Sequence, residues 1–254
     1  MVGSPNEYLA IQPPPLSMQN VVAGYPGRVL VRNLFLDLPG PAFVAVVGHN
    51  GSGKTTLFRV LTGQLPYQGS VQLLGQEVRT LRRGAAAALL GYLPQRGGLG
   101  FAIAVRELVV MGRYRHHGLL STYAPADYAL ADVALARVGM AHLAGRDFAQ
   151  LSGGEQQLVW LAQLSLQDAQ VYLLDEPSQQ LDVYYRGQVF GLVHAWATEQ
   201  GKTVLCSTHD LDNLSGLTGH LLNLSEPRPQ LRALSAATVA AARQVLAQAP
   251  TAVG

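Results

Sequence analysis

The sequence predicts an α/β fold with a mainly parallel β-sheet, and three observations support this prediction. Four apolar runs alternate with stretches of helical periodicity: VQLLG near residue 71, LLGYL near 89, VYLLD at 171 and TVLCS at 203. Such alternation is typical of a parallel sheet buried on both faces. A glycine-rich segment separates the apolar run AFVAVV from the helical stretch LFRVLTG. The chain has 254 residues and 48% hydrophobic content, enough to bury the core of one large domain.

The ends and the composition of the chain narrow the class of protein. We expect residues 1–15 to form a flexible tail, because their proline run prevents regular structure, and residues 16–254 to form a single domain. No apolar stretch approaches the ~20 residues needed to cross a bilayer, and no basic region precedes an apolar one at the N-terminus. We therefore expect a soluble protein. Cys206 is the only cysteine, so no disulfide can form within the chain.

The charge of the chain disfavours nucleic acid as a partner. Charged residues make up only 13% of the sequence, the net charge is +2, and no block of five like charges occurs. We expect the arginines near 79–83 and 113–115 to face solvent or a protein partner.

The segment GHNGSGKTT at residues 48–56 matches the phosphate-loop pattern G-x-x-x-x-G-K-[ST] and lies between a predicted strand and a predicted helix. Lys54 is one of only two lysines against 16 arginines, and its compact ammonium can fit between phosphate oxygens. We expect Lys54 to contact the β- and γ-phosphates of a nucleoside triphosphate and Thr55 to hold Mg²⁺. The alternative is a glycine-rich turn with an incidental lysine. The residues predicted to surround the phosphates are Gly48, His49, Asn50, Gly51, Ser52, Gly53, Lys54, Thr55 and Thr56.

Polar residues follow two further predicted strands, at the edge where ligands of parallel sheets bind. VYLLDEP ends in Asp175 and Glu176. Paired carboxylates are costly at a buried strand end unless a cation or a reaction uses them. We expect Asp175 to hold magnesium, through Thr55 or through a water, and Glu176 to polarise the attacking water. A helix-capping acidic pair is the alternative. His209 in TVLCSTHDL is predicted to contact the γ-phosphate, although a lone histidine is more often structural.

The segment LSGGE at residues 151–155 follows a loop and opens the predicted helix EQQLVWLAQLSL. Ser152 and the backbone N–H groups of Gly153 and Gly154 would form a second anion site at the N-terminus of that helix. One chain therefore contains two half-sites for phosphate.

Six motifs occur in order along residues 18–224: GHNGSGKTT, GYLPQ, LSGGE, VYLLDEP, SQQLD and STHDL. Together they resemble the nucleotide-binding subunit of an ATP-binding cassette transporter. The resemblance implies a P-loop NTPase core with an N-terminal antiparallel β subdomain and an α-helical lobe inserted at about residues 96–165. It also implies a homodimer in which two cassettes meet head to tail and each ATP lies between the phosphate loop of one and the LSGGE motif of the other.

The same resemblance assigns three further residues. Gln95, at the end of GYLPQ, is placed like a glutamine that contacts magnesium and hinges the helical lobe, and an ordinary polar loop residue is the alternative. Tyr25 is placed like an aromatic residue that stacks on adenine, although it could be a turn tyrosine. Asp182 in SQQLD is placed in a loop that crosses the dimer interface. The chain departs from the common pattern at Leu158, Gln163 and Gln179.

The segment AVRELVVMGRYRH resembles importers of chelated metals, namely iron-siderophore, haem and cobalamin systems, with zinc and manganese importers close behind. The resemblance implies ATP hydrolysis coupled to import, and membrane permease subunits that dock near residues 95–115. It implies an indirect partnership with a substrate-binding protein, and a peripheral location at the cytoplasmic face of the plasma membrane. A soluble cassette ATPase and a metabolic kinase or GTPase remain alternatives. His116 and His117 are expected to face solvent or a partner rather than bind a metal.

Overall fold

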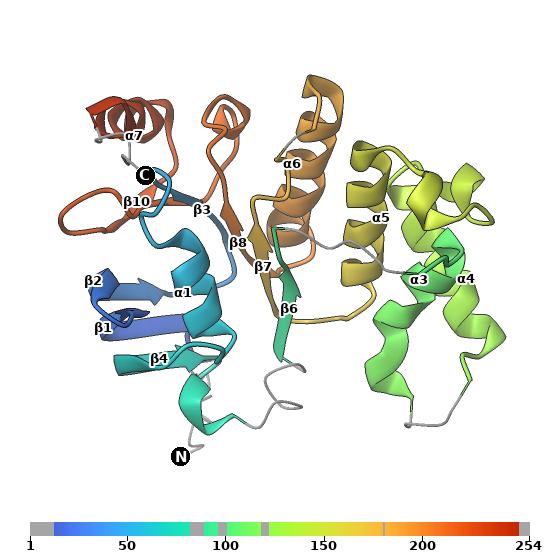
Figure 1. Cartoon of the computed structure of the whole chain (residues 1–254), viewed down its shortest axis with the longest axis horizontal. Helices are drawn as coiled ribbons and strands as arrows, with labels where there is room; N and C mark the ends of the chain where they lie inside the picture. Colours follow the sequence, from blue (N-terminus) through green and yellow to red (C-terminus); the bar gives the residue numbers. More distant parts are fainter. Residues whose placement is uncertain (1–12, 82–88, 96–100, 118–121, 180, 249–254) are drawn as a thin grey trace, which may run out of the picture.

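The computed structural model describes residues 13–81, 89–95, 101–117, 122–179 and 181–248. It contains two β-sheets and a group of helices that lies beyond the edge of the larger sheet (Figure 1). The expected tail falls outside the described residues as far as residue 12. No helix in the described ranges combines the length and the apolar character that a membrane crossing requires.

The smaller sheet is antiparallel and has the strand order β2-β1-β4-β5. Its strands are β1 (Leu16–Tyr25), β2 (Arg28–Leu38), β4 (Tyr67–Leu73) and β5 (Gln76–Glu77). The VQLLG run forms the end of β4 here, so its assignment to the parallel sheet was wrong. The physical reason lies in its burial: Val71 and Leu73 are buried while Gln72 between them is not, as in a strand with one covered face.

The larger sheet has the strand order β10-β9-β3-β8-β7-β6, and only β10 runs antiparallel to its neighbour. Its strands are β3 (Phe43–Val47), β6 (Leu90–Leu93), β7 (Val171–Asp175), β8 (Thr203–Ser207), β9 (His220–Asn223) and β10 (Leu231–Ala233). Every residue of β3, β7 and β8 is buried. This burial confirms the predicted parallel sheet with two covered faces.

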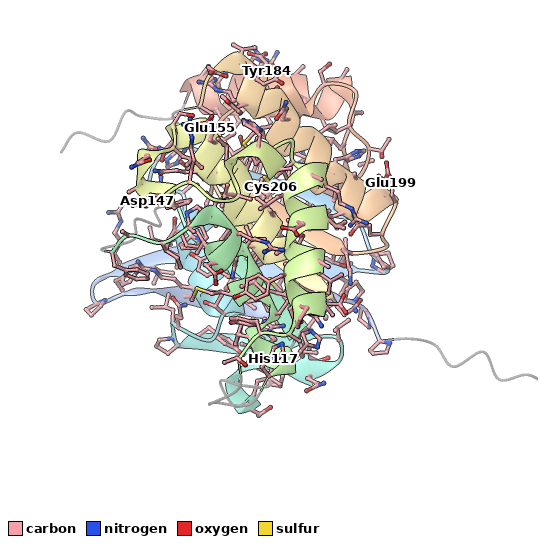
Figure 2. All side chains as sticks on the ribbon, turned by 90° about the vertical axis from the view of Figure 1, so that its right-hand side faces the viewer. His117, Asp147, Glu155, Tyr184, Glu199 and Cys206 are labelled. Atoms are coloured by element: carbon pink, nitrogen blue, oxygen red, sulfur yellow. The ribbon has the colours of Figure 1, made fainter. Side chains whose placement is uncertain are left out.

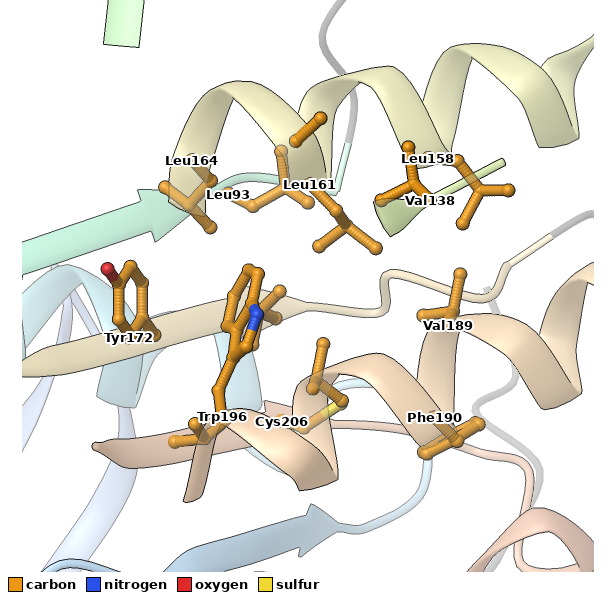
Figure 3. Packing of buried hydrophobic residues seen from close by; sticks show 14 of the residues in the cluster. Leu93, Val138, Leu158, Leu161, Leu164, Tyr172, Val189, Phe190, Trp196 and Cys206 are labelled. Atoms are coloured by element: carbon orange, nitrogen blue, oxygen red, sulfur yellow. The ribbon is translucent and has the colours of Figure 1, made fainter. Parts of the chain in front are cut away.

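Successive residues of β3 pack into two different cores. Val44 and Val46 pack with α1 (Lys54–Leu61) and the antiparallel sheet. Ala45 and Val47 pack into the opposite core, which includes α5 (Gly153–Ser165) and α6 (Val183–Thr198). Figure 3 shows this second core, where α5 and α6 place leucine and aromatic side chains around Tyr172 of β7 and Cys206 of β8. The core explains why Cys206 is buried, and that burial raises the pKa of its thiol.

The chain between β6 and β7 supplies the helical lobe that the sequence predicts. Its helices are α3 (Val105–Val110), α4 (Pro125–Arg137) and α5, and these three pack against one another. In Figure 1, α3 and α4 lie farthest from the antiparallel sheet. The last helix, α7 (Ala236–Gln248), follows β10 at the opposite side of the molecule.

Two arginines and one histidine of the lobe, Arg113, Arg115 and His117, were expected to face solvent or a partner; each is half-buried and also binds within the chain. Arg115 donates to the carbonyls of Leu90 and Gln167, which ties the lobe to strand β6 at the sheet edge. Arg113 and His117 both pair with a carboxylate of α4 at 3.2 and 2.9 Å. Their partner, Asp127, caps α4 by accepting from the backbone of Ala124. The guanidinium groups of Arg113 and Arg115 give the Asp127 carboxylate and these carbonyls the partners that buried polar groups require.

Candidate active site

The phosphate-loop segment connects β3 to α1 and needs glycine at specific positions. Gly51 and Gly53 have φ values of 79° and 104°, in the left-handed region that other residues avoid. A Cβ atom on Gly48 would collide with the hydroxyl of Ser52. Helix α1 begins at Lys54 with no side-chain cap and no acidic residue in its first turn. Its first N–H groups therefore remain available to an anion at its positive end.

Lys54 is buried inside this loop, with its side chain 6% exposed. Its Nζ donates to the carbonyl of Gly48 at 2.9 Å and lies 3.0 Å from His209 Nε2. It also lies 3.5 Å from Glu176 Oε1. Burial lowers the pKa of Lys54, while the nearby Glu176 and Asp175 carboxylates oppose that shift. The one lysine of the loop thus lies where the carboxyl ends of β7 and β8 converge.

Glu176 follows β7 with a left-handed backbone, at a φ of 53°. Non-glycine residues in this region are strained and concentrate at functional sites. The backbone N–H of Glu176 donates to Ser207 Oγ at 2.8 Å, which holds this conformation. Its Oε1 lies 2.7 Å from His209 Nε2, and its Oε2 accepts from Gln95 Nε2 at 2.9 Å. Burial acts to raise the pKa of Glu176, but hydrogen bonding and charge from His209 and Lys54 outweigh it and lower the pKa.

Asp175 is the last residue of β7 and is 2% exposed. Its Oδ1 accepts from Ser207 Oγ at 2.7 Å, whereas its buried Oδ2 has no hydrogen-bond partner among the described residues. An orphaned carboxylate oxygen is costly unless a cation binds it. The pair does not cap a helix in this structure, because the next helix, α6, is capped by Asp182. This disfavours the capping alternative for Asp175.

Magnesium fits the residues at this position. Mg²⁺ prefers oxygen ligands and is usually held by one or two carboxylates plus substrate phosphates. Asp175 offers the orphaned oxygen, while Thr55 and Gln95 line one pocket together and offer a hydroxyl and an amide oxygen. Across the described ranges no group of three or more His, Cys, Asp or Glu side chains could hold a metal alone. Waters and phosphate oxygens would complete the coordination of a cation here.

A pocket of about 190 Å³ opens over the phosphate loop and is lined on its other side by Gln95 and Glu176. The residues that line it are Leu30, Asn50, Gly51, Gly53, Lys54, Thr55, Thr56, Gln95 and Glu176. Pockets for whole small molecules usually measure about 300–1,000 Å³. This pocket is therefore large enough for the phosphate groups of a nucleotide but too small to enclose its sugar and base as well.

The structure places the other predicted site residues elsewhere. Tyr25 lies at the end of β1, 38% exposed, where its hydroxyl accepts from Arg59 at 2.8 Å. Ser152 caps α5 and shares a capping box with Glu155, whose Oε2 accepts from both the backbone N–H and the hydroxyl of Ser152 at 2.8 Å. Asp182 caps α6 by accepting from Tyr185 N at 3.0 Å. None of these residues is among those that line the 190 Å³ pocket.

The starts of α5 and α6 lie beside each other at one end of the molecule. Gly154 packs directly under the ring of Tyr185, while a Cβ on Gly153 would meet nothing within 4 Å. In Figure 2, Glu155 and Tyr184 lie toward the same end, far from His117. The second predicted anion site is therefore a surface feature of this end, with Ser152 and Gly153 exposed.

Sequence reasoning missed several residues that shape the site. Ser207 bridges Asp175 and Glu176, as described above, and it directly precedes the THD segment that contains His209. The backbone N–H of His49 donates to Ser225 Oγ at 2.9 Å, so this N–H group already has an acceptor within the protein. Gln179 accepts from Gln95 Nε2 at 3.0 Å. Ser207 could have been found because it ends a strand at the ligand-binding edge, whereas nothing local marks Ser225.

Comparisons with known proteins agree with this geometry. The ABC transporter family model matches residues 31–179. The ferric enterobactin transport ATP-binding protein FepC of Escherichia coli is 32% identical over 209 residues, which cover 82% of this chain and 77% of that protein. The manganese transport system ATP-binding protein MntB of Bacillus subtilis is 36% identical over 200 residues, 78% of each. A solved ABC transporter structure, described as of the metal-chelate type and inward-facing, has a TM-score of 0.75 at 29% identity and covers 87% of this chain and 84% of that one.

The matched segment begins within β2 and runs through the phosphate loop, Gln95, α5 and the Asp175–Glu176 pair, which is more than half of the chain. The chain therefore belongs to the ABC transporter family, as an ATP-binding subunit with ATPase activity.

Proposed function

We propose that this chain dimerises around two ATP molecules and that its ATP hydrolysis powers transmembrane import of a metal chelate of the siderophore, haem or cobalamin type. The observation that carries the hydrolytic part is the convergence of Lys54, Glu176 and His209 within 3.5 Å of one another beside an uncapped helix N-terminus. Lysine, a carboxylate base and an anion-binding helix end are the parts that phosphoryl transfer to water requires.

Each residue has a distinct role in this proposal. Lys54 exchanges its contacts with Gly48 O and Glu176 for the β- and γ-phosphate oxygens. Glu176 accepts a proton from the attacking water at a carboxylate oxygen, and its lowered pKa keeps that carboxylate ionised at neutral pH. His209 lies against both residues and contacts the γ-phosphate. Asp175, Thr55 and Gln95 would hold magnesium, which when bound neutralises charge on the phosphate oxygens.

Three features support a second copy of the chain as the partner that completes the site. The pocket over the phosphate loop covers only the phosphate end of a nucleotide, and the capped N-terminus of α5 is a separate surface half-site. Exposed apolar side chains follow Asp182 directly: Val183 is 82% exposed and Tyr184 is 67% exposed. Exposed apolar residues beside a half-site are typical of an interaction surface. In the dimer, Ser152, Gly153, Gly154 and Asp182 would face the nucleotide of the partner, while Tyr25 would stack on adenine in its own protomer.

The described part of residues 95–115 supports docking of a membrane permease. Phe101, Met111 and Tyr114 are 59%, 41% and 47% exposed. Apolar side chains on the surface of the helical lobe, with Arg106 nearby in sequence, are suited to a helix of a membrane partner. This placement makes the chain peripheral at the cytoplasmic face of the plasma membrane, linked through the permease to a substrate-binding protein.

The proposed substrate class rests on the relatives. The similarity to FepC and to the metal-chelate type structure favours a chelated metal. The similarity to MntB keeps manganese as a second candidate. These two candidates are separated by measuring the uptake of a radioactive ferric siderophore, of cobalamin and of Mn²⁺ by cells with and without this chain. A defect limited to Mn²⁺ would contradict chelate import.

The dimer is tested by a shape-matched pair of variants at Ser152 in a Glu176→Gln background, where hydrolysis is slow. Ser152→Asn should keep α5 intact, because Asn caps helices well and can donate to Glu155 as Ser152 does. Ser152→Asp caps as well but faces the Glu155 carboxylate, so the helicity of the two monomers is first compared by circular dichroism. Only Asp sets a carboxylate against phosphate. We expect sedimentation with ATP and Mg²⁺ to show a dimer for the Asn variant and a monomer for the Asp variant, while both monomers still bind ATP. Equal dimerisation of the two variants would contradict the two-half-site arrangement.

A further inference from the structure

Gln95 makes two hydrogen bonds with the turn that follows β7. Its Nε2 donates to Glu176 Oε2 at 2.9 Å and to Gln179 Oε1 at 3.0 Å. The turn is closed by the backbone, because Gln179 N donates to Glu176 O at 3.1 Å. The side chain of Gln179 thus reaches back from the end of a turn to a residue 84 positions earlier in the chain.

These contacts fix which way the Gln95 amide faces. A primary amide has two N–H donors on nitrogen and one acceptor oxygen. The carboxylate of Glu176 accepts only, so Nε2 is the atom that must face it, and Gln179 presents its amide oxygen to the same Nε2. The Gln95 oxygen is left free of both contacts, on a side chain that lines the pocket shared with Thr55. The amide is therefore oriented so that its oxygen, rather than its nitrogen, can serve as a ligand for a hard cation.

Glu176 alone cannot hold this orientation throughout a reaction. A general base must turn a carboxylate oxygen to the attacking water, and that movement competes with its contact to Gln95. The acceptor on Gln179 has no such second partner to serve and can keep its contact with Gln95. It also lies outside the phosphate pocket, among the residues of a separate pocket that includes His209 and Arg186.

We propose that Gln179 is a positioning residue that holds the Gln95 amide with its oxygen toward the phosphate pocket while Glu176 acts as the base. The inference rests on the roles given to Gln95 and Glu176 under the proposed function.

The test uses Gln179→Met, which keeps the length of the side chain and removes its acceptor. One lost hydrogen bond is expected to lower kcat about 5-fold. The Mg²⁺ concentration for half-maximal binding of a fluorescent ATP analogue should rise several-fold, while affinity for the analogue without Mg²⁺ and the KM for ATP should change less than twofold. Gln230→Met, at an exposed position that lines neither the phosphate pocket nor the pocket of Gln179, is the matched control and should behave as wild type.

A double-mutant cycle with Gln95→Ala decides whether Gln179 acts through Gln95. We expect Gln179→Met to have no further effect on kcat or on the Mg²⁺ dependence once Gln95 is removed. An equal loss in both backgrounds, or a Gln179→Met protein that matches wild type, would overturn the inference. A Gln95→Ala protein with wild-type kcat and Mg²⁺ dependence would instead contradict the role of Gln95 in the proposed function.

Discussion

Glu176 Oε1 lies 2.7 Å from His209 Nε2, and this contact joins the carboxyl ends of the neighbouring parallel strands β7 and β8. Lys54 Nζ lies within 3.5 Å of both atoms. Lys54 also donates to the carbonyl of Gly48 at 2.9 Å. In the proposed function, ATP would exchange these contacts for phosphate oxygens, so the net gain in free energy would be smaller than the phosphate contacts alone would give.

The role of Lys54 is tested by Lys54→Ala. The substitution deletes a charge-assisted contact to phosphate worth about 1.5–3 kcal/mol, partly offset by the contacts that Lys54 gives up in the free protein, so the Kd for ATP should rise about 10-fold. Direct titration calorimetry measures it. Lys202→Ala is a matched control, because Lys202 is the only other lysine and pairs with Asp168 at 3.0 Å. Unchanged ATP affinity in Lys54→Ala would contradict the phosphate-loop assignment.

Glu176→Gln separates binding from hydrolysis. Glutamine keeps the shape and the acceptor for Gln95 but cannot take a proton from water, so hydrolysis should fall about 100-fold or more. ATP binding should be retained, because Lys54 no longer pairs with a carboxylate in the free protein. Steady-state phosphate release and equilibrium ATP titration on the same preparation give both quantities. Wild-type turnover in this variant would show that Glu176 is not the base.

The sequence predicts that Lys54, Asp175, Glu176 and His209 lie at one edge of the sheet, because each ends or follows a strand and the carboxyl ends of parallel strands share one edge. Their close approach depends in addition on the strand order, in which β3, β8 and β7 are neighbours. The contacts of Gln179 with Gln95, and of Ser225 with His49, join loops that have no periodicity. The VQLLG run was assigned to the wrong sheet, because periodicity predicts a strand without naming the strand it pairs with.

The capping box of α5 gives stability a pH dependence. The Ser152 backbone N–H and hydroxyl donate to Glu155 and lower the pKa of its carboxyl below the ordinary value of 4.5. A carboxyl whose pKa is lowered on folding stabilises the protein above its unfolded pKa, and that contribution disappears as the pH falls through the folded pKa. Glu155→Ala should therefore lower the free energy of unfolding at pH 7 by about 1 kcal/mol.

The difference in unfolding free energy between wild type and Glu155→Ala should shrink steadily once the pH falls below the pKa of Glu155 in the unfolded chain. Urea unfolding of wild type and Glu155→Ala at a series of pH values measures it. Glu155→Gln helps to separate charge from hydrogen bonding, because glutamine can complete a capping box without a charge. Its stability relative to wild type should depend on pH in the same direction but with a smaller loss at pH 7. A difference between wild type and Glu155→Ala that stays constant from pH 7 to acid would contradict this account.

Alanine substitutions at two adjacent glycines, Gly153 and Gly154 at the start of α5, are expected to have different effects on stability and dimerisation. A Cβ on Gly154 would collide with the ring of Tyr185, whereas a Cβ on Gly153 would meet nothing within 4 Å. Overpacking of this kind typically costs about 1–3 kcal/mol, and a shift that relieves it would move the half-site away from Asp182 and α6. Gly154→Ala should therefore lower the thermal midpoint and weaken ATP-driven dimerisation in a Glu176→Gln background. Gly153→Ala keeps its N–H group and should leave the thermal midpoint and the dimerisation of the Glu176→Gln protein unchanged within error. Equal behaviour of the two alanine variants would show that the contact between α5 and Tyr185 does not position the half-site.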